Sequence, residues 1–496
     1  MNSYLLTTIL ALPIVGLIII ALLPSNKDKP IKFTALAFTL ASFVLSLIMF
    51  FMFDRSSTAI GIIQFEQKLA WIPAINVHYH LGVDGLSLPL VILMTFLGFL
   101  SVLVSWKIQL RPREYFIWIL LLETSILGVF CSLDLILFFL FWELELIPMY
   151  FLISIWGSGR KEYSSIKYVI YTLIGSAMML AGFLSVYFTT GSFDMLEVAG
   201  KLAVAQPVIP LAAMFFLLFI GFAIKLPMFP LHTWLPDAHT DAPTAVSVIL
   251  AGALLKMGGY GMIRLVVSVL PGVARQAAPI LTTLAIIGIL YGAWVTMRQT
   301  DLKRLIAYSS VSHMGYVLLG IFALTEISLT GAALQMFSHG IITGLLFAMV
   351  GIVYEKTHDR NLANLGGLAR RMPVIVVFFS IAGLASLGLP GTSGFAAEFI
   401  TFVGCYSSSV FGGIQIYTLL GVFGIVFTAG YILWMLQRAF YGPPQDKFNE
   451  MPDADNVEKI CMFCFVAAIL LVGIYPAVLT NVIKMGIEPL MKVIGI

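Results

Sequence analysis

The stretch Phe219-Ile-Gly-Phe-Ala-Ile-Lys-Leu-Pro-Met-Phe-Pro230 places the ammonium group of Lys225 inside an apolar run long enough to cross a bilayer. Pro227 and Pro230 lack backbone N–H groups and interrupt the helix just after the lysine. A charge beside a broken helix is tolerated at membrane depth only next to a partner, water or a protein-lined cavity. Lys225 is therefore a candidate functional residue, and the alternative is a lysine that snorkels from a helix end.

The whole chain has the composition of a polytopic membrane protein. Of its 496 residues, 60% are hydrophobic and only 11% are charged. We therefore expect an all-α fold. The apolar runs of spanning length predict about fourteen transmembrane helices, at 3–23, 31–53, 86–106, 115–132, 134–156, 165–190, 208–229, 244–267, 278–298, 303–324, 328–354, 373–404, 415–440 and 460–483. The first run has no basic start and no small-residue cleavage site, so we expect it to be retained as a span.

Lysine and arginine concentrate in alternate loops between these helices. The positive-inside rule then predicts that both termini lie on the non-cytoplasmic side. The net charge of +3 reflects this orientation and does not indicate nucleic-acid binding.

Two of the predicted helices are interrupted by proline and glycine. Helix 7 breaks at Lys225-Leu-Pro227, and helix 12 breaks at Gly388-Leu-Pro-Gly-Thr-Ser-Gly394. The breaks lie five helices apart, so the interrupted segments point in opposite directions, as in inverted-repeat transporters. We expect helices 4–8 and 9–13 to form two inverted repeats. The expected divisions are helices 1–3 with a non-cytoplasmic loop, the first repeat, the second repeat, and a cytoplasmic loop with helix 14, at residues 1–110, 111–268, 269–440 and 441–496.

No motif for a redox or nucleotide cofactor is present in the sequence. Cys461-Met-Phe-Cys464 has the spacing of a metal-ligand pair, but its neighbours are apolar and no histidine lies nearby. Phosphate-binding, dinucleotide-binding and iron–sulfur patterns are also missing from the sequence. We therefore expect no cofactor and no metal in this chain, and no electron transfer through it.

Glu143 and Glu145 are candidate partners for Lys225. They lie two residues apart, about 200° around a helix, so both cannot face one cavity. If one of them pairs with Lys225, the other faces a neighbouring helix or subunit. A buried Glu–Lys pair that opens and closes is suited to act as a gate for proton movement.

Four further residues are candidates for carrying protons across the membrane. Lys256 lies mid-helix with no carboxylate in its own helix, and His313 and His339 each have hydroxyl-bearing neighbours. Glu398 follows the break in helix 12 and is suited to be a terminal proton site. A structural role or a metal site is the alternative for the two histidines.

Three other titratable residues are less easily assigned. His232 and His239 flank an acidic loop after helix 7, which we interpret as a structured cytoplasmic mouth, with a metal site as the alternative. Glu123 lies within a predicted span and cannot be assigned to a pathway from the sequence.

The chain resembles the M-type antiporter-like membrane subunits of respiratory complex I along essentially its whole length. The runs that carry the resemblance are Leu81-Gly-Val-Asp-Gly-Leu-Ser87, Trp142-Glu-Leu-Glu-Leu-Ile-Pro148, Lys225-Leu-Pro-Met-Phe-Pro-Leu-His-Thr-Trp-Leu-Pro-Asp-Ala-His239, Asp301-Leu-Lys-Arg-Leu-Ile-Ala-Tyr-Ser309, Ser312-His-Met-Gly315 and Leu387-Gly-Leu-Pro-Gly391. The acid at Glu398 and the short chain after the last helix favour the M type over its cation/proton antiporter and L-type relatives.

The resemblance implies a site and a set of partners. It pairs Glu143 with Lys225 and places Lys256, His313, His339 and Glu398 on the proton pathway, while the role of Glu145 stays open. It also implies a proton-translocating subunit of a redox-driven pump, with L-type and N-type neighbours in the lipid bilayer of a bacterial cytoplasmic or equivalent energy-transducing membrane. Iron–sulfur clusters, flavin and quinone would then belong to partner subunits. The alternatives are a cation/proton antiporter subunit without redox coupling and a membrane scaffold.

Overall fold

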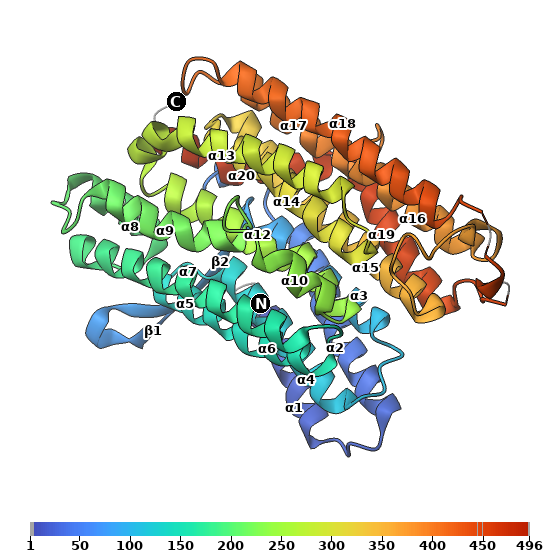
Figure 1. Ribbon diagram of the computed structural model, residues 1–496. Helices are drawn as coiled ribbons and strands as arrows, with labels where there is room; N and C mark the ends of the chain where they lie inside the picture. The colour runs from blue at the N-terminus through green and yellow to red at the C-terminus, as the bar shows by residue number, and fades with distance from the viewer. Residues whose placement is uncertain (1–3, 444, 449, 495–496) are drawn as a thin grey trace.

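The computed structural model describes residues 4–443, 445–448 and 450–494, and it is almost entirely helical (Figure 1). The ends of the chain, and residues 444 and 449 of the predicted cytoplasmic loop before helix 14, lie outside the described residues. In the first half, the helices are α1 (Leu5–Leu22), α2 (Asp28–Met52), α3 (Ser87–Val104), α4 (Pro112–Cys131), α5 (Leu135–Leu144), α6 (Leu146–Trp156), α7 (Lys161–Thr190), α8 (Met195–Val204), α9 (Leu211–Lys225), α10 (Trp234–Asp241), α11 (Thr244–Ile249) and α12 (Leu255–Gly261). In the second half, they are α13 (Pro271–Met297), α14 (Leu302–Phe322), α15 (Glu326–Thr357), α16 (Pro373–Ser386), α17 (Ser393–Tyr406), α18 (Ile414–Ala439), α19 (Asn456–Ile474) and α20 (Ala477–Ile494).

Twelve helical segments of the described chain are long and apolar enough to cross a membrane. Two shorter apolar helices, α9 and α16, occupy the predicted helices 7 and 12. The all-α membrane fold is therefore confirmed, as are both interruptions. The total of fourteen spans and the inverted repeats stay predictions.

The break in helix 12 lies between α16 and α17. Gly388 and Gly391 adopt the left-handed backbone region, with φ of 82° and 90°, where a side chain would be strained. Pro390, between them, supplies no N–H to continue a helix. These residues turn the chain so that α17 restarts with Glu398 in its second turn.

The centre of the bundle is formed by α14, α15 and the predicted helix 8. The most apolar windows of α15 and of residues 244–267 are completely buried, whereas those of α1 and α2 are one-third buried. Helix 8 is irregular, because α11 and α12 are separated by the π-helical turn η4 (Leu250–Leu254), and a second one, η5 (Met262–Val267), follows. Such turns widen a helix and often occur at functional sites.

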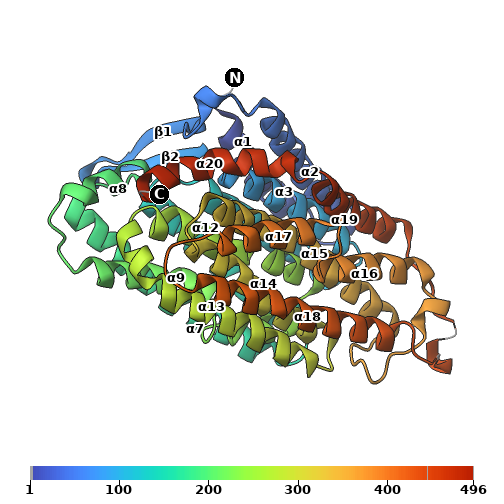
Figure 2. The same cartoon turned by 90° about the horizontal axis from the view of Figure 1, so that it is seen from above.

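The last predicted helix differs from the structure. The range 460–483 was expected to be one span, but α19 ends at Ile474 and an amphipathic helix, α20, begins after Pro476. The proline ends the span because it cannot continue the helix. α20 packs on α15 and α3, and a Cβ at Gly85 would lie 1.9 Å from the carbonyl oxygen of Val482 in α20. Figure 2 shows α20 at the edge of the bundle that also carries the only sheet of the described chain.

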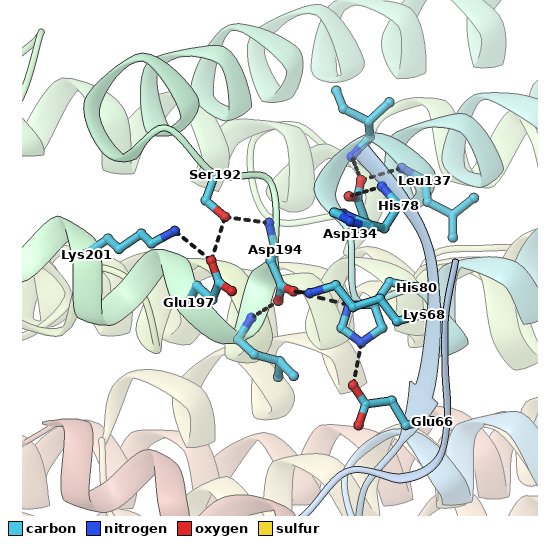
Figure 3. A network of polar contacts seen from close by, with 12 residues as sticks. Glu66, Lys68, His78, His80, Asp134, Leu137, Ser192, Asp194, Glu197 and Lys201 are labelled. Atoms are coloured by element: carbon cyan, nitrogen blue, oxygen red, sulfur yellow. Dashed lines mark hydrogen bonds and ion pairs between the residues drawn. The ribbon is translucent and has the colours of Figure 1, made fainter. Parts of the chain in front are cut away.

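This sheet is an antiparallel hairpin within the predicted non-cytoplasmic loop between helices 2 and 3, formed by β1 (Gln64–Ile72) and β2 (Val77–Val83). The buried ring of His80 lies between two carboxylates, with Nε2 2.8 Å from Glu66 Oε1 and Nδ1 3.3 Å from Asp194 Oδ2 (Figure 3). Lys68 Nζ lies 2.6 Å from the same Asp194 oxygen. Burial lowers the pKa of His80, but the two carboxylates outweigh it and raise this pKa above 6.5.

The same network reaches the start of α5. Asp134 caps this helix by accepting hydrogen bonds from the backbone N–H groups of Ile136 and Leu137, and it also accepts one from His78 of β2 (Figure 3). The hairpin therefore holds the helix that carries Glu143.

Candidate functional site

The backbone carbonyls that the break after α9 leaves without a helical donor accept hydrogen bonds from other groups of the protein. Because Pro227 has no N–H, the carbonyl of Ala223 accepts from Met228 instead, at 3.0 Å. The carbonyl of Ile224 accepts from the indole N–H of Trp234 in α10, at 2.9 Å. Lys225 is thus fixed at a helix end with its side chain only 1% exposed.

Lys225 forms its ion pair with Glu145. Its Nζ contacts Glu145 Oε1, and the hydroxyl of Tyr168 lies 2.6 Å from Oε2, to which it donates. Lys225 also donates to the Tyr168 oxygen at 3.1 Å. The rings of Trp142 and Tyr168 lie 5.4 and 5.2 Å from Nζ, within cation–π range. Glu145 is fully buried, so the ammonium and the carboxylate neutralise each other away from water.

The structure pairs Lys225 with Glu145 and not with Glu143, which was the expected partner. Pro148 has no N–H to donate to the carbonyl of Leu144, so α5 ends and α6 begins at Glu145. Of the two glutamates, only Glu145 faces α7 and α9. Glu143 points to another side, as the spacing of the two glutamates indicates. Its carboxylate interacts with the Ser176 hydroxyl, while Oε1 has no hydrogen-bond partner among the described residues.

Glu143 lines a lateral apolar groove of about 920 Å³ on the outside of α5, α6 and α7. The groove walls include large exposed apolar side chains, namely Leu140, Ile147, Tyr150 and Leu173. Glu143 is the only carboxylate in this lining.

Lys256 lies in α12, between the two π-helical turns, and is fully buried. Its Nζ contacts the carbonyl oxygen of Ala251 and lies 2.7 Å from Nδ1 of His339 in α15. In the described part of the chain, no carboxylate forms an ion pair with it. The backbone at the helix 7 break packs directly on α12, because a Cβ at Gly258 of α12 would lie 2.6 Å from the backbone nitrogen of Leu226.

His339 connects Lys256 with the second half of the bundle. Its ring centroid lies 5.6 Å from that of His313 in α14. His313 Nδ1 lies 3.2 Å from Glu398 Oε1, and its Nε2 lies 3.3 Å from Ser386 Oγ. A cavity of about 10 Å³, roughly the room that one water needs, lies between the two rings and Glu398. Lys256, His339, His313 and Glu398 therefore form one buried line.

Glu398 also lines a second lateral groove, of about 490 Å³, on the outside of α17 and α18. Its walls include the exposed residues Phe399 and Leu419. Figure 1 shows α18 and α7 along opposite sides of the bundle. Each side of the bundle therefore has an apolar groove with one carboxylate from the site.

The predicted cytoplasmic mouth contains an additional buried lysine. Lys303, the first residue of the predicted span 303–324, is 4% exposed and donates to the carbonyl of Ala242 at 2.5 Å. The ring of His239 stacks on Phe347 at 4.5 Å, and both nitrogens of its ring lack hydrogen-bond partners in the described chain. The charges of Lys303 and Lys256 both act on His239. His239 thus lies near the path from the mouth to Lys256.

Two other predicted positions stay outside the line. Glu123 is buried against Gly98, and neither of its oxygens has a partner among the described residues. His232 contacts the ring of Tyr291, at 5.2 Å. No group of three potential metal ligands gathers in the described ranges.

Sequence reasoning missed three polar contacts of the site: Tyr168, Gln335 and Tyr431. Gln335 donates to Glu398 at 3.4 Å, and the Tyr431 hydroxyl lies 3.5 Å from His313 Nε2. Neutral polar residues in apolar helices give a weak sequence signal, because their partners come from distant helices.

The fold and the site define a class: a polytopic membrane protein with a continuous line of protonatable side chains inside its bundle. The profile of the family described as "NADH:quinone oxidoreductase/Mrp antiporter, TM" matches residues 132–428. The NAD(P)H-quinone oxidoreductase chain 4 1 of Picosynechococcus sp. is 42% identical, over 96% of this chain and 90% of its own. The NADH-quinone oxidoreductase subunit M of Rhodobacter capsulatus is 38% identical, over 98% and 96%.

A solved structure agrees with these relatives. A chain of respiratory complex I from Thermus thermophilus superposes with a TM-score of 0.88 over the full length of both chains, at 28% identity. The present chain belongs to the NADH:quinone oxidoreductase/Mrp antiporter family, as an antiporter-like subunit of the complex I M type. It is a multi-pass subunit of a multi-subunit membrane complex.

Proposed function

We propose that this chain forms one proton channel of a complex I-type, redox-driven pump. The observation that carries the proposal is the buried line Lys256–His339–His313–Glu398, which spans both halves of the bundle within hydrogen-bond or single-water reach. Such a line allows protons to pass from group to group without an open pore. The redox centres, including iron–sulfur clusters, flavin and quinone, belong to partner subunits.

Protons would be taken up at the cytoplasmic mouth near Lys303 and His239, and would reach Lys256 beside the broken helix 7. They would then cross the two histidines and leave near Glu398. Both termini are assigned to the non-cytoplasmic side, from the distribution of basic residues.

The ion pair of Lys225 with Glu145 would control this transfer. A close pair of unit charges interacts by about 4 kcal/mol at an effective dielectric constant of 20. Opening the pair changes the electrostatic potential at Lys256, because the end of α9 packs on α12. The two lateral grooves would face the L-type and N-type neighbours, which links Glu143 and Glu398 to the adjacent subunits.

The test is proton pumping by the purified, assembled complex in proteoliposomes, measured together with quinone reduction. We expect Lys256→Met and Glu398→Gln to assemble and to lower the number of protons moved per electron. Lys201→Met is the matched control, because this lysine is exposed and pairs with Glu197 on α8, away from the line. Wild-type stoichiometry in both site variants would contradict the proposal.

Cation/proton antiport without redox coupling is the second candidate, because the family also includes the Mrp antiporters. It predicts sodium-dependent proton movement that does not need an electron donor. Pumping that requires quinone reduction and is indifferent to sodium would exclude it.

A further inference from the structure

Helix 8 carries a second buried charge after Lys256, towards the side of the bundle that holds the β1–β2 hairpin. Arg264 lies in η5, eight residues after Lys256, and its side chain is 10% exposed. Its Nη2 lies 2.5 Å from Oδ2 of Asp84, which follows directly after β2. Neither Arg264 nor Asp84 belongs to the buried line that ends at Glu398.

Asp84 is fixed at the first turn of α3. It accepts hydrogen bonds from the backbone N–H groups of Leu86 and Ser87, each at 3.0 Å. These donors and the positive end of the α3 dipole offset its negative charge. The backbone of α20 covers this turn, because a Cβ at Gly85 would lie 1.9 Å from the carbonyl oxygen of Val482.

The guanidinium of Arg264 faces Tyr260, which lies between it and Lys256 along helix 8. Its Cζ is 5.5 Å from the centroid of the Tyr260 ring, and the Tyr260 hydroxyl donates to the carbonyl of Phe130 at 3.4 Å. Tyr260 and Phe130 are fully buried, with their ring centroids 5.6 Å apart. The positive end of the Asp84–Arg264 pair therefore points towards Lys256 through an aromatic layer.

Apolar side chains press against the other faces of helix 8 at this level. A Cβ at Gly259 would lie 2.5 Å from the sulfur of Met336, and one at Gly261 would lie 2.2 Å from the ring of Phe222. Met336 and Phe222 are fully buried and pack against the bare glycine backbone. A proton that leaves Lys256 in this direction meets a tightly packed apolar layer and then a fixed positive charge.

We propose that Tyr260 and the Asp84–Arg264 pair form a barrier that stops protons in the buried line from crossing directly to the hairpin side. Arginine stays protonated in proteins, so its guanidinium cannot pass a proton on. A fixed arginine charge also raises the electrostatic barrier to protons and cations in a membrane pore. Protons on Lys256 are then directed sideways to His339. This inference rests on the proposed function, because it gives the channel its direction after Lys256.

A mechanical clamp between helix 8 and the start of α3 is the alternative role of this ion pair. Removing one charge of a buried pair strands the other, whereas replacing both is often neutral for folding. The double variant Asp84→Asn/Arg264→Met therefore removes the fixed charge and leaves no stranded partner. A clamp predicts a less stable complex with no proton leak, and a barrier predicts a leak in a fully assembled complex.

The test is the passive proton permeability of proteoliposomes that contain the assembled complex, with no electron donor present. A potassium gradient with valinomycin sets the membrane potential, and an internal pH dye reports proton entry. We expect entry to be about tenfold faster in Asp84→Asn/Arg264→Met than in the wild type, which needs a loss of about 1.4 kcal/mol of barrier. Arg264→Lys keeps a charge beside Asp84 and should keep the wild-type rate. Glu197→Gln/Lys201→Met, which removes an exposed ion pair of α8, is the matched control.

Adding Lys256→Met to the double variant shows where the leak passes. We expect the triple variant to return to the wild-type rate, because the leak would run through the buried line. A leak that persists in the triple variant, or a wild-type rate in the assembled double variant, would overturn the inference. If the double variant does not assemble, Arg264→Gln serves instead, because its amide can still donate to Asp84 without the fixed charge.

These measurements separate the barrier from the proposed function, because they need no electron transfer. Lost pumping in Lys256→Met with a wild-type leak rate in the double variant would keep the proton channel and reject the barrier. Wild-type pumping in Lys256→Met would reject the channel and the barrier with it. Lost pumping in Lys256→Met, together with a leak in the double variant that Lys256→Met abolishes, supports both.

Discussion

Removing the carboxylates around Lys225 one at a time and together should give unequal and non-additive losses of stability. With both gone, the ammonium is buried at 1% exposure without an anionic partner, which costs about 3–5 kcal/mol. Glu145→Gln alone loses the charge-assisted bonds from Tyr168, about 1.5–3 kcal/mol, while the charge of Glu143 still acts on the lysine. Glu143→Gln alone, half-buried and outside the ion pair, should cost less than about 1 kcal/mol.

The stability of the assembled complex can be followed by thiol labelling during heating. Cys131, Cys405 and Cys461 are buried, so they react with a maleimide only when this chain unfolds. Mass spectrometry resolves their labelling from that of cysteines in partner subunits. The midpoint of labelling should fall in the order Glu143→Gln, Glu145→Gln, double variant.

Two results would refute the reasoning. A larger loss in Glu143→Gln than in Glu145→Gln would mean that the pair in the structure is assigned to the wrong glutamate. Equal losses in Glu145→Gln and the double variant would mean that the charge of Glu143 does not stabilise the lysine.

Three further predictions test other parts of the structure. His339→Leu should abolish coupled pumping in reconstituted complex while quinone reduction continues, because it removes the contact of Lys256 at 2.7 Å; unchanged pumping would exclude His339 from the line. The pKa of His80 is raised in the folded protein, so its stabilisation of the hairpin is fully present below pH 6.5 and is lost as the pH rises through the raised value. The protection factors of the β1 and β2 amides, which are corrected for the intrinsic base catalysis of exchange, should therefore fall as the pH rises through this value, and His80→Phe should remove this fall. Gly85→Ala should detach α20 at a cost of roughly 1–3 kcal/mol, since the new Cβ would lie 1.9 Å from a backbone carbonyl; protease sensitivity of α20 measures it, and full protection would contradict it.

Much of the site could be predicted from the sequence, because charges inside apolar runs are conspicuous. Lys225, Lys256 and Glu398 stand out in this way, and prolines mark both helix breaks. The fold class follows from the length and number of the apolar segments.

The choice between Glu143 and Glu145 could not be predicted, because it depends on the rotation of α5–α6 about its axis. Packing against Tyr168 from α7 fixes that rotation, and no local pattern reports it. The burial of Lys303 was missed for a similar reason, since its carbonyl partner at Ala242 lies 61 residues away in sequence. The end of α19 did have a signal, Pro476, but apolar residues on both sides hid it.

The most direct test of the central claim is the number of protons pumped per electron by the assembled complex that carries Lys225→Met. The proposal predicts that the complex assembles and reduces quinone with a clearly lower proton-to-electron ratio than the wild type, while Lys201→Met leaves the ratio unchanged. A wild-type ratio in the fully assembled Lys225→Met complex would contradict the claim that this buried lysine controls proton transfer.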